Sequence, residues 1–147
     1  LCKAADEEPF KSWTFVFAAV ADKIERPSQN VWLLPKVWDA AQLYGLADML
    51  VLRAGGSTLT EAAVLGLPAL VVPWMQAADN HQFHNALAFA GENEGMIWTE
   101  NDGYEALVSS LVRLNGIKGK NHGRAGDLRG RGGAICENLW SLLFPAV

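Results

Sequence analysis

Long hydrophobic runs, cysteine and excess positive charge are all scarce in this 147-residue chain. Its most apolar stretches, Trp13–Ala21 and Leu67–Met75, are each about nine residues long, whereas a membrane-spanning helix needs ~20. The two cysteines, Cys2 and Cys136, lie near opposite ends, which argues against a disulfide framework and a cysteine-based zinc site. Because the formal net charge is −4, we expect no nucleic acid partner.

The composition is that of a folded domain. Hydrophobic residues make up 50% of the chain and charged residues 19%, which excludes an intrinsically disordered protein. The length suits one compact domain and is too short for two full ones. The chain begins at Leu1 within a helix-like pattern, so we expect a fragment of a longer protein.

Short apolar runs alternate with helical patterns over residues 1–115. The apolar runs predict buried strands at Trp13–Val20, Asn30–Leu34, Asp48–Arg53, Pro68–Pro73 and Met96–Trp98. Helices are predicted at residues 39–47, at Thr58–Leu65 with Gly66 as its C′ residue, at Asn80–Glu92, and from Asn101 or Asp102 to Leu114. This alternation predicts an α/β fold with a doubly wound parallel sheet, right-handed crossovers and helices on both faces.

The chain after this domain has a different composition. Residues 116–133 are rich in glycine and carry Lys118, Lys120, Arg124, Arg129 and Arg131. One interpretation is a solvated linker before a closing helix, Ala134–Leu143, within the terminal segment 134–147. The other is a loop that contacts an anion, either a phosphate or acidic lipid headgroups. The sequence leaves both interpretations open.

The loop after the third predicted strand, Arg53–Thr58, is a candidate binding site, because ligands of open parallel sheets bind beyond the carboxyl ends of the strands. Gly55 and Gly56 allow a positive φ and a close approach of ligand to backbone. Ser57 and Thr58 add hydroxyls where a helix begins, and a helix N-terminus suits a phosphate. Alternatively, the glycines only turn the chain and a hydroxyl caps the helix.

Glu61 follows Thr58 by three residues and lies one turn further into the predicted helix. Two roles compete for its carboxylate. It can complete a capping box by reaching back to the backbone of Ser57 or Thr58. It can also accept hydrogen bonds from a cis-diol, as acidic residues do with nucleotide ribose.

The segment after the fourth predicted strand, Pro73–Ala86, lies at the same edge of the sheet. His81, Gln82 and Asn85 gather there in an otherwise apolar helix, and such side chains suit the recognition of sugar hydroxyls. The alternative is a metal held by His81 and His84, but no third ligand has motif spacing. We therefore expect no metal and no cofactor. A Ser–His–acid triad stays open on composition, although no nucleophile-elbow sequence is present.

Two stretches, Ala47–Pro73 and Asp79–Ala86, together resemble the carboxy-terminal, donor-binding domain of MurG-type UDP-GlcNAc glycosyltransferases. The resemblance is carried by Arg-x-Gly, Thr-x-x-Glu, Gly-x-Pro, Pro and His-Gln-x-x-Asn-Ala in this order. It is dense from about Asn30 to Thr99 and thin elsewhere. It implies one Rossmann-like half of a GT-B fold and an inverting mechanism without a bound metal.

The resemblance also implies roles for individual residues. The donor pyrophosphate would lie on the helix N-terminus, held by Gly55, Gly56, Ser57 and Thr58. Glu61 would bind the ribose hydroxyls, and the backbone of Val37 would meet the uracil edge. His81 and Gln82 would face the GlcNAc hydroxyls, with Asn85 supporting them.

The whole enzyme implied by the resemblance transfers N-acetylglucosamine from UDP-GlcNAc to lipid I, giving lipid II in peptidoglycan synthesis. It would lie in the cytoplasm, peripheral to the cytoplasmic face of the inner membrane. The domain that binds the lipid-linked acceptor and supplies the general base is missing from these residues, as is the first strand of the donor domain. We therefore expect no catalytic residue here, and at most weak UDP-GlcNAc binding without turnover.

Two further functions remain open. The chain could be the soluble subunit of a split UDP-sugar transferase, paired with a membrane-anchored acceptor subunit. It could also be a non-catalytic nucleotide-binding module in which Glu61 only caps its helix.

Overall fold

The computed structural model describes residues 5–18, 28–34, 43–45, 47–76 and 80–117. The chain forms two compact units, Leu1–Leu43 and Tyr44–Val147, and each is described by itself. Predictions that fall on residues 39–42 and 118–147, including the closing helix, lie outside the described residues. Within the described stretches, no helix is both long and apolar enough to cross a membrane.

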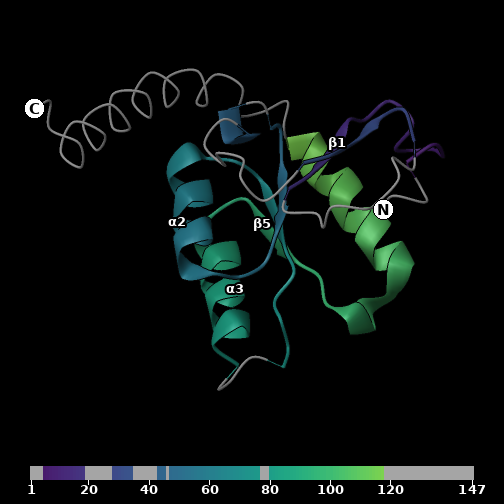
Figure 1. Ribbon diagram of the computed structural model, residues 1–147. Coiled ribbons are helices and arrows are strands. Elements are labelled where there is room, and N and C mark those ends of the chain that lie inside the picture. The colour runs from purple at the N-terminus through teal and green to yellow at the C-terminus, as the bar shows by residue number, and fades with distance from the viewer. Residues whose placement is uncertain (1–4, 19–27, 35–42, 46, 77–79, 118–147) are drawn as a thin grey trace, which may run out of the picture. The chain divides into compact units, whose positions relative to one another are not determined.

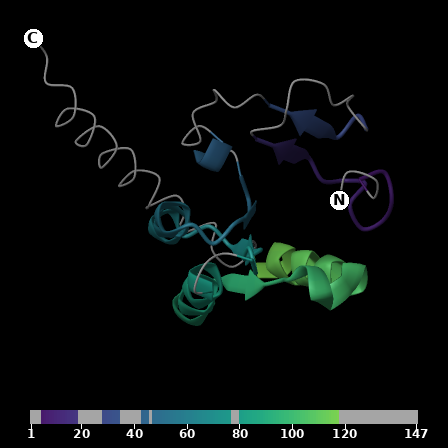
Figure 2. The ribbon, with the colours of Figure 1, turned by 60° about the horizontal axis from the view of Figure 1, so that its bottom comes forward.

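The first unit holds a two-stranded parallel sheet. Strand β1 (Phe15–Phe17) pairs with β2 (Val31–Leu33), and Figure 2 shows the two side by side. Both strands lie inside the predicted apolar runs. The Asn30 side chain amide, directly before β2, donates to the carbonyls of Ala5 at 2.8 Å and Trp13 at 3.0 Å. These bonds fix the segment that leads into β1.

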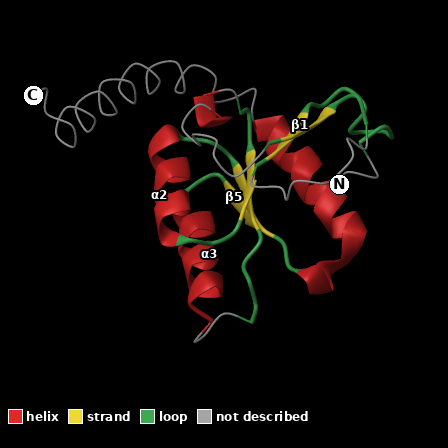
Figure 3. Ribbon diagram, viewed as in Figure 1, coloured by secondary structure: helices red, strands yellow, loops and turns green. Residues whose placement is uncertain are grey.

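The second unit holds a three-stranded parallel sheet in the order β3 (Leu50–Leu52), β4 (Ala69–Val71) and β5 (Gly95–Ile97). Helix α2 (Gly56–Leu65) connects β3 to β4, and α3 (His81–Glu92) connects β4 to β5. Figures 1 and 3 show both helices on one side of the sheet and the helix at residues 103–117 on the other. The predicted α/β class, with parallel strands and helices on both faces, is confirmed.

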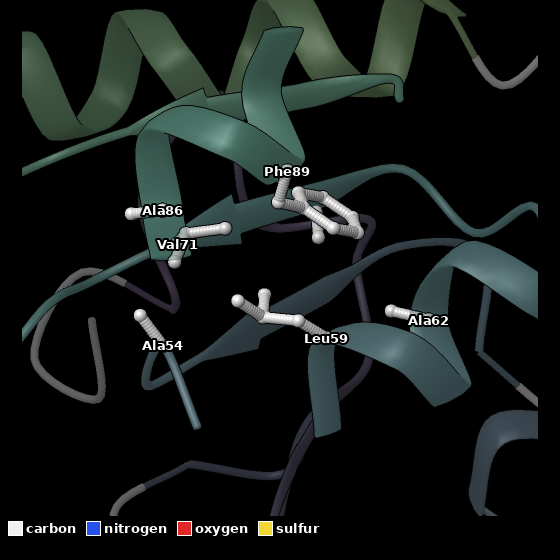
Figure 4. Close-up of a cluster of buried hydrophobic side chains, with 7 residues drawn as sticks. Ala54, Leu59, Ala62, Val71, Ala86 and Phe89 are labelled. Carbon is white, nitrogen blue, oxygen red and sulfur yellow. The ribbon is translucent and has the colours of Figure 1, made fainter. Parts of the chain in front are cut away.

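The core on the α2–α3 side is built mainly from small residues. Figure 4 shows its members, which are Ala54, Leu59, Ala62, Ala69, Val71, Ala86 and Phe89. Alanine on both helices and on β4 lets the helices pack close to the sheet, with Leu59 and Phe89 as the large side chains. This close packing brings the first turns of α2 and α3 to the carboxyl ends of β3 and β4.

The opposite face is covered by the helix at residues 103–117. Its buried residues Leu107, Leu111 and Leu114 follow helical spacing and form one apolar stripe. Leu70, fully buried between Ala69 and Val71 in β4, points to this face because strand side chains alternate. The helix follows a short 3-10 turn, η3 (Glu100–Asp102).

Local interactions explain where α2 ends and where the chain turns into the helix at residues 103–117. Gly66 ends α2 with a left-handed φ of 62°, which confirms its predicted C′ position. Before the last helix, the Thr99 backbone N–H donates to the Asp102 carboxylate at 2.6 Å, and the Thr99 hydroxyl donates at 2.8 Å. Both hydrogen bonds lower the pKa of Asp102, and the bond from the Thr99 backbone has the larger effect. The chain therefore turns at Thr99, slightly earlier than the predicted start at Asn101 or Asp102.

Candidate functional site

Two loops lie next to each other at one edge of the sheet because they leave paired parallel strands. Residues 53–55 follow β3 and residues 72–76 follow β4. The Val72 N–H donates to the Leu52 carbonyl at 2.8 Å, so the pairing continues past the strand ends. The Arg53 guanidinium donates to the Val72 carbonyl at 3.4 Å. We call residues 53–61, 72–76 and 80–85 the rim.

The start of α2 differs from its prediction in a way that matters for binding. The helix begins at Gly56 with Gly55 as N-cap, two residues before the predicted Thr58, and no side chain caps it. Ser57 and Thr58 therefore lie inside the first turn, and the alternative in which one of them caps the helix is wrong. The first backbone N–H groups of a helix have no partner within it, so this uncapped turn offers donors to a ligand.

The two glycines of the rim do not use a left-handed backbone. Gly55 is extended, with φ −73° and ψ 135°, and Gly56 is the first residue of α2. The positive φ that glycine allows is therefore not used at either position, because the chain enters the helix without a tight turn. A Cβ on Gly56 would meet nothing within 4 Å, and a Cβ on Gly55 would lie 3.8 Å from the Thr58 hydroxyl oxygen. The backbone here is thus open to close approach.

Glu61 is exposed in the second turn of α2, on the same face as Ser57 four residues earlier. The capping-box role is ruled out for it, because α2 has no side-chain cap and Glu61 lies six positions after the N-cap. Burial of Tyr44, then a hydrogen bond to the Glu61 carboxylate and the charge of that carboxylate, raise the pKa of Tyr44 to about 12.

The start of α3 supplies the amides of the rim. Asn80, the N-cap, has a left-handed φ of 52°, and α3 begins at His81 as predicted to within one residue. The Gln82 Oε1 accepts the Trp74 backbone N–H at 2.9 Å, which ties α3 to the loop after β4. The Asn85 Nδ2 donates to the Ala54 carbonyl at 3.2 Å, which ties α3 to the loop after β3.

These amide bonds determine which side-chain atoms of Gln82 and Asn85 can still meet a ligand. With its oxygen bound to Trp74, the Gln82 amide presents its Nε2 donor. His81 is exposed beside it at the start of α3. Asn85 holds the backbone of the neighbouring loop, which is a supporting position. Thr60 contributes no free hydroxyl, since its Oγ1 donates to the Gly56 carbonyl at 2.9 Å within α2.

The structure therefore gathers eight of the predicted site residues on the rim, and these are Gly55, Gly56, Ser57, Thr58, Glu61, His81, Gln82 and Asn85. Val37 lies outside the described residues. Among the residues that the structure describes, no group of three or more His, Cys, Asp or Glu side chains could hold a metal. Sequence reasoning missed Trp74, whose backbone N–H binds the Gln82 side chain. It also missed Tyr44, whose pKa is raised in part by the Glu61 carboxylate.

Comparisons with known proteins identify the family of this chain. The model of the glycosyltransferase family 28 C-terminal domain matches residues 19–124. A protein of Desulforamulus reducens named "UDP-N-acetylglucosamine--N-acetylmuramyl-(pentapeptide) pyrophosphoryl-undecaprenol N-acetylglucosamine transferase" is 32% identical over 111 residues, 74% of this chain and 30% of that protein. Proteins with the same name are 35% identical in Bdellovibrio bacteriovorus (69% of this chain, 29% of that protein) and 48% identical in Pseudomonas putida (43% and 18%).

This chain thus spans less than a third of the length of these relatives. No solved structure matches it. The family model covers most of the chain, including both loops of the rim and the helices that follow them. On this match, the chain belongs to the family of glycosyltransferase family 28 C-terminal domains.

Proposed function

We propose that this chain is the donor-binding part of an inverting N-acetylglucosaminyltransferase that takes the sugar from UDP-GlcNAc and converts lipid I to lipid II. The observation that carries the proposal is the juxtaposition, on paired strands, of an uncapped glycine-led helix start and an amide-rich helix start. The relatives, whose printed name describes transfer of N-acetylglucosamine to an undecaprenol-linked acceptor, support the choice of donor and acceptor.

The pyrophosphate of the donor would lie against residues 55–58. The unpartnered N–H groups and the positive end of the α2 dipole favour a dianionic group at this place. Because the glycines carry no Cβ, phosphate oxygens can come within hydrogen-bonding distance of the backbone. The same dipole would stabilise the negative charge that develops on the leaving UDP in the transition state.

Ribose and sugar would lie on either side of the pyrophosphate. Glu61, one turn along the exposed face of α2 from Ser57, would accept hydrogen bonds from the ribose hydroxyls. The Gln82 Nε2 and His81 would meet the GlcNAc hydroxyls, and Asn85 would hold the loop between the two helices. The uracil contact of Val37 stays a prediction.

The general base and the acceptor would come from a further domain or a partner subunit, because transfer needs acceptor, donor and base held together. The undecaprenol-linked acceptor would bring the whole enzyme to the membrane surface, as a peripheral protein on its cytoplasmic side. The 147-residue chain by itself is therefore expected to bind donor without transferring sugar.

Titration calorimetry of the 147-residue chain with UDP-GlcNAc tests this proposal. Glu61→Ala should weaken binding by about 10- to 100-fold, because hydrogen bonds to a charged group contribute ~1.5–3 kcal/mol. The matched control is Glu105→Ala, which removes an exposed carboxylate from the helix on the other face of the sheet. Absence of wild-type binding, or equal affinities for the two variants, would contradict the donor site.

A further inference from the structure

The loop after β4 is held through the backbone of its first three residues. The Val72 N–H donates to the Leu52 carbonyl at 2.8 Å. Pro73 follows, and the proline ring fixes its φ. The Trp74 N–H then donates to the Gln82 Oε1 at 2.9 Å. The point at which the Trp74 side chain leaves the backbone is therefore fixed by contacts to β3 and α3.

The Trp74 side chain itself stays open to a ligand. Trp74 is 53% exposed, and Phe83, the other aromatic residue of the rim, is less exposed. An indole is large, flat and apolar, and only two rotatable bonds join it to the backbone. Because this backbone is already held, ordering the ring against a ligand costs little conformational entropy. Trp74 thus gives the rim a preorganised aromatic surface.

This aromatic surface starts close to the amide donor of the rim. The Gln82 Oε1, which accepts the Trp74 N–H, belongs to the same planar amide as the Gln82 Nε2. Covalent geometry and the 2.9 Å bond place the Trp74 Cα no more than about 7 Å from this Nε2. Exposed His81 directly precedes Gln82 in the first turn of α3. Trp74 and the polar groups of α3 can therefore contact one small ligand together.

The chemistry of a hexose explains why these two kinds of group suit one ligand. The ring hydroxyls of GlcNAc are equatorial, so they point outward around the ring, and both faces of the ring carry C–H groups. Hydrogen bonds from Gln82 and His81 suit the edge of such a ring and leave its faces uncovered. An aromatic ring covers a C–H face by burying apolar surface and by attracting the weakly positive C–H groups to its negative π face.

We propose that the indole of Trp74 packs against a C–H face of the donor's GlcNAc and so distinguishes the sugar nucleotide from UDP alone. The ring is assigned to the sugar because Trp74 is bonded to α3, which carries Gln82 and His81, whereas Glu61, the proposed partner of the ribose, lies on α2. The inference rests on the proposed function and adds an apolar contact to its polar ones.

Two equally exposed tryptophans offer a matched pair of variants. Trp74→Ala removes the indole and keeps the backbone N–H that Gln82 accepts. Trp32→Ala removes an indole with the same exposed fraction, 53%, from β2 in the first unit. Trp74→Phe keeps a smaller aromatic face. Dissociation constants for UDP-GlcNAc and UDP are measured by calorimetry on the 147-residue chain, with circular dichroism of each variant as a check on folding.

We expect Trp74→Ala to weaken UDP-GlcNAc binding about 3- to 10-fold, the range of one aromatic contact, and to leave UDP binding unchanged. Trp74→Phe should lose less, and Trp32→Ala should leave both ligands unaffected. In proton NMR of UDP-GlcNAc, the C–H protons of the sugar should shift upfield on binding to the wild-type chain, because they lie over an aromatic face. These upfield shifts should vanish with Trp74→Ala and persist with Trp32→Ala.

Several results would overturn the contact. An unchanged UDP-GlcNAc affinity in Trp74→Ala, or sugar protons that do not shift upfield with the wild-type chain, would contradict it. Equal losses for UDP and UDP-GlcNAc would mean that Trp74 supports the fold or meets the nucleotide instead. If Trp74→Ala does not fold, the wild-type shifts and the loss in Trp74→Phe decide.

The failure of this inference is separable from that of the proposed function. If Glu61→Ala leaves the binding of UDP and UDP-GlcNAc unchanged, the proposed function fails. If Glu61→Ala weakens both ligands while Trp74→Ala weakens neither, only the contact between Trp74 and the sugar fails.

Discussion

The bond between Asn85 and Ala54 gives a quantitative test of how the rim is held together. Asn85 donates to the Ala54 carbonyl at 3.2 Å, and Ala54 is fully buried. In Asn85→Ala this carbonyl loses its donor in a place that water does not reach. A buried acceptor left without a partner costs ~1–3 kcal/mol, and because 3.2 Å is at the long end of the hydrogen-bond range we expect ~1–2 kcal/mol.

Helix propensity partly hides this loss, since alanine is a better helix former than asparagine by roughly 0.5 kcal/mol. Asn115→Ala is the matched control, because Asn115 is exposed in the helix at residues 103–117 and gains the same propensity. The difference between the two variants isolates the lost bond. With a urea m-value of ~2 kcal/mol/M, it corresponds to a midpoint about 0.5–1 M lower for Asn85→Ala.

The assay is equilibrium urea unfolding followed by far-ultraviolet circular dichroism on wild type and both variants. A midpoint for Asn85→Ala equal to that of Asn115→Ala would refute the reasoning that this amide ties α3 to the loop after β3. A change in m-value without a shift in the unfolding free energy would refute it too, since it would report a change in the unfolded state.

Three further predictions concern single residues. Gln82→Ala should weaken UDP-GlcNAc about 3- to 10-fold in calorimetry and barely change UDP, and equal losses would remove Gln82 from sugar recognition. Gly55→Ala should change the free energy of unfolding by less than ~1 kcal/mol, because Gly55 has an ordinary φ. It should still weaken UDP-GlcNAc binding about tenfold, because the added Cβ fills the space over the backbone. An unchanged affinity would contradict the close approach of the ligand to this backbone. Gly95→Ala should destabilise the chain by ~1–3 kcal/mol, because its Cβ would lie 2.7 Å from the Phe89 ring and 3.1 Å from the Ala90 Cα; an unchanged thermal midpoint would contradict this packing.

The elements that the sequence predicted well are those decided by local patterns. Of the five strands that the structure describes, four lie within the predicted apolar runs, and β5 begins at Gly95, one residue before the predicted run Met96–Trp98. Continuous hydrophobic stretches are typical of strands in parallel sheets, which is why the sequence located them. The end of α2 was predictable from Gly66, whose left-handed φ few other residues tolerate. Family motifs then located the rim, because residues after neighbouring parallel strands must share one edge of the sheet.

The start of α2 was not predictable from side chains. Ser57 and Thr58 are good caps in general, but the chain enters the helix at Gly55, where no side chain caps it. Ala54, directly before the N-cap, is buried, and its carbonyl accepts a hydrogen bond from Asn85, a tertiary contact that local sequence patterns do not reveal.

Interactions between different elements were also beyond local sequence patterns. Tyr44 and Glu61 lie on different elements, and neither periodicity nor motif spacing links them. Likewise, no sequence pattern indicated that the Gln82 side-chain oxygen accepts the Trp74 backbone N–H. For Glu61 and Gln82 alike, a residue on another element of the fold affects how the side chain can meet a ligand.

A nitrogen-edited NMR titration of the labelled chain with UDP-GlcNAc tests the central claim most directly, because it reports at each backbone amide. The account predicts the largest shift changes at the amides of residues 55–58, with smaller ones at Glu61, His81 and Gln82. Shift changes confined to the opposite edge of the sheet, such as Leu67 and Gly95, or no changes at saturating ligand, would contradict it.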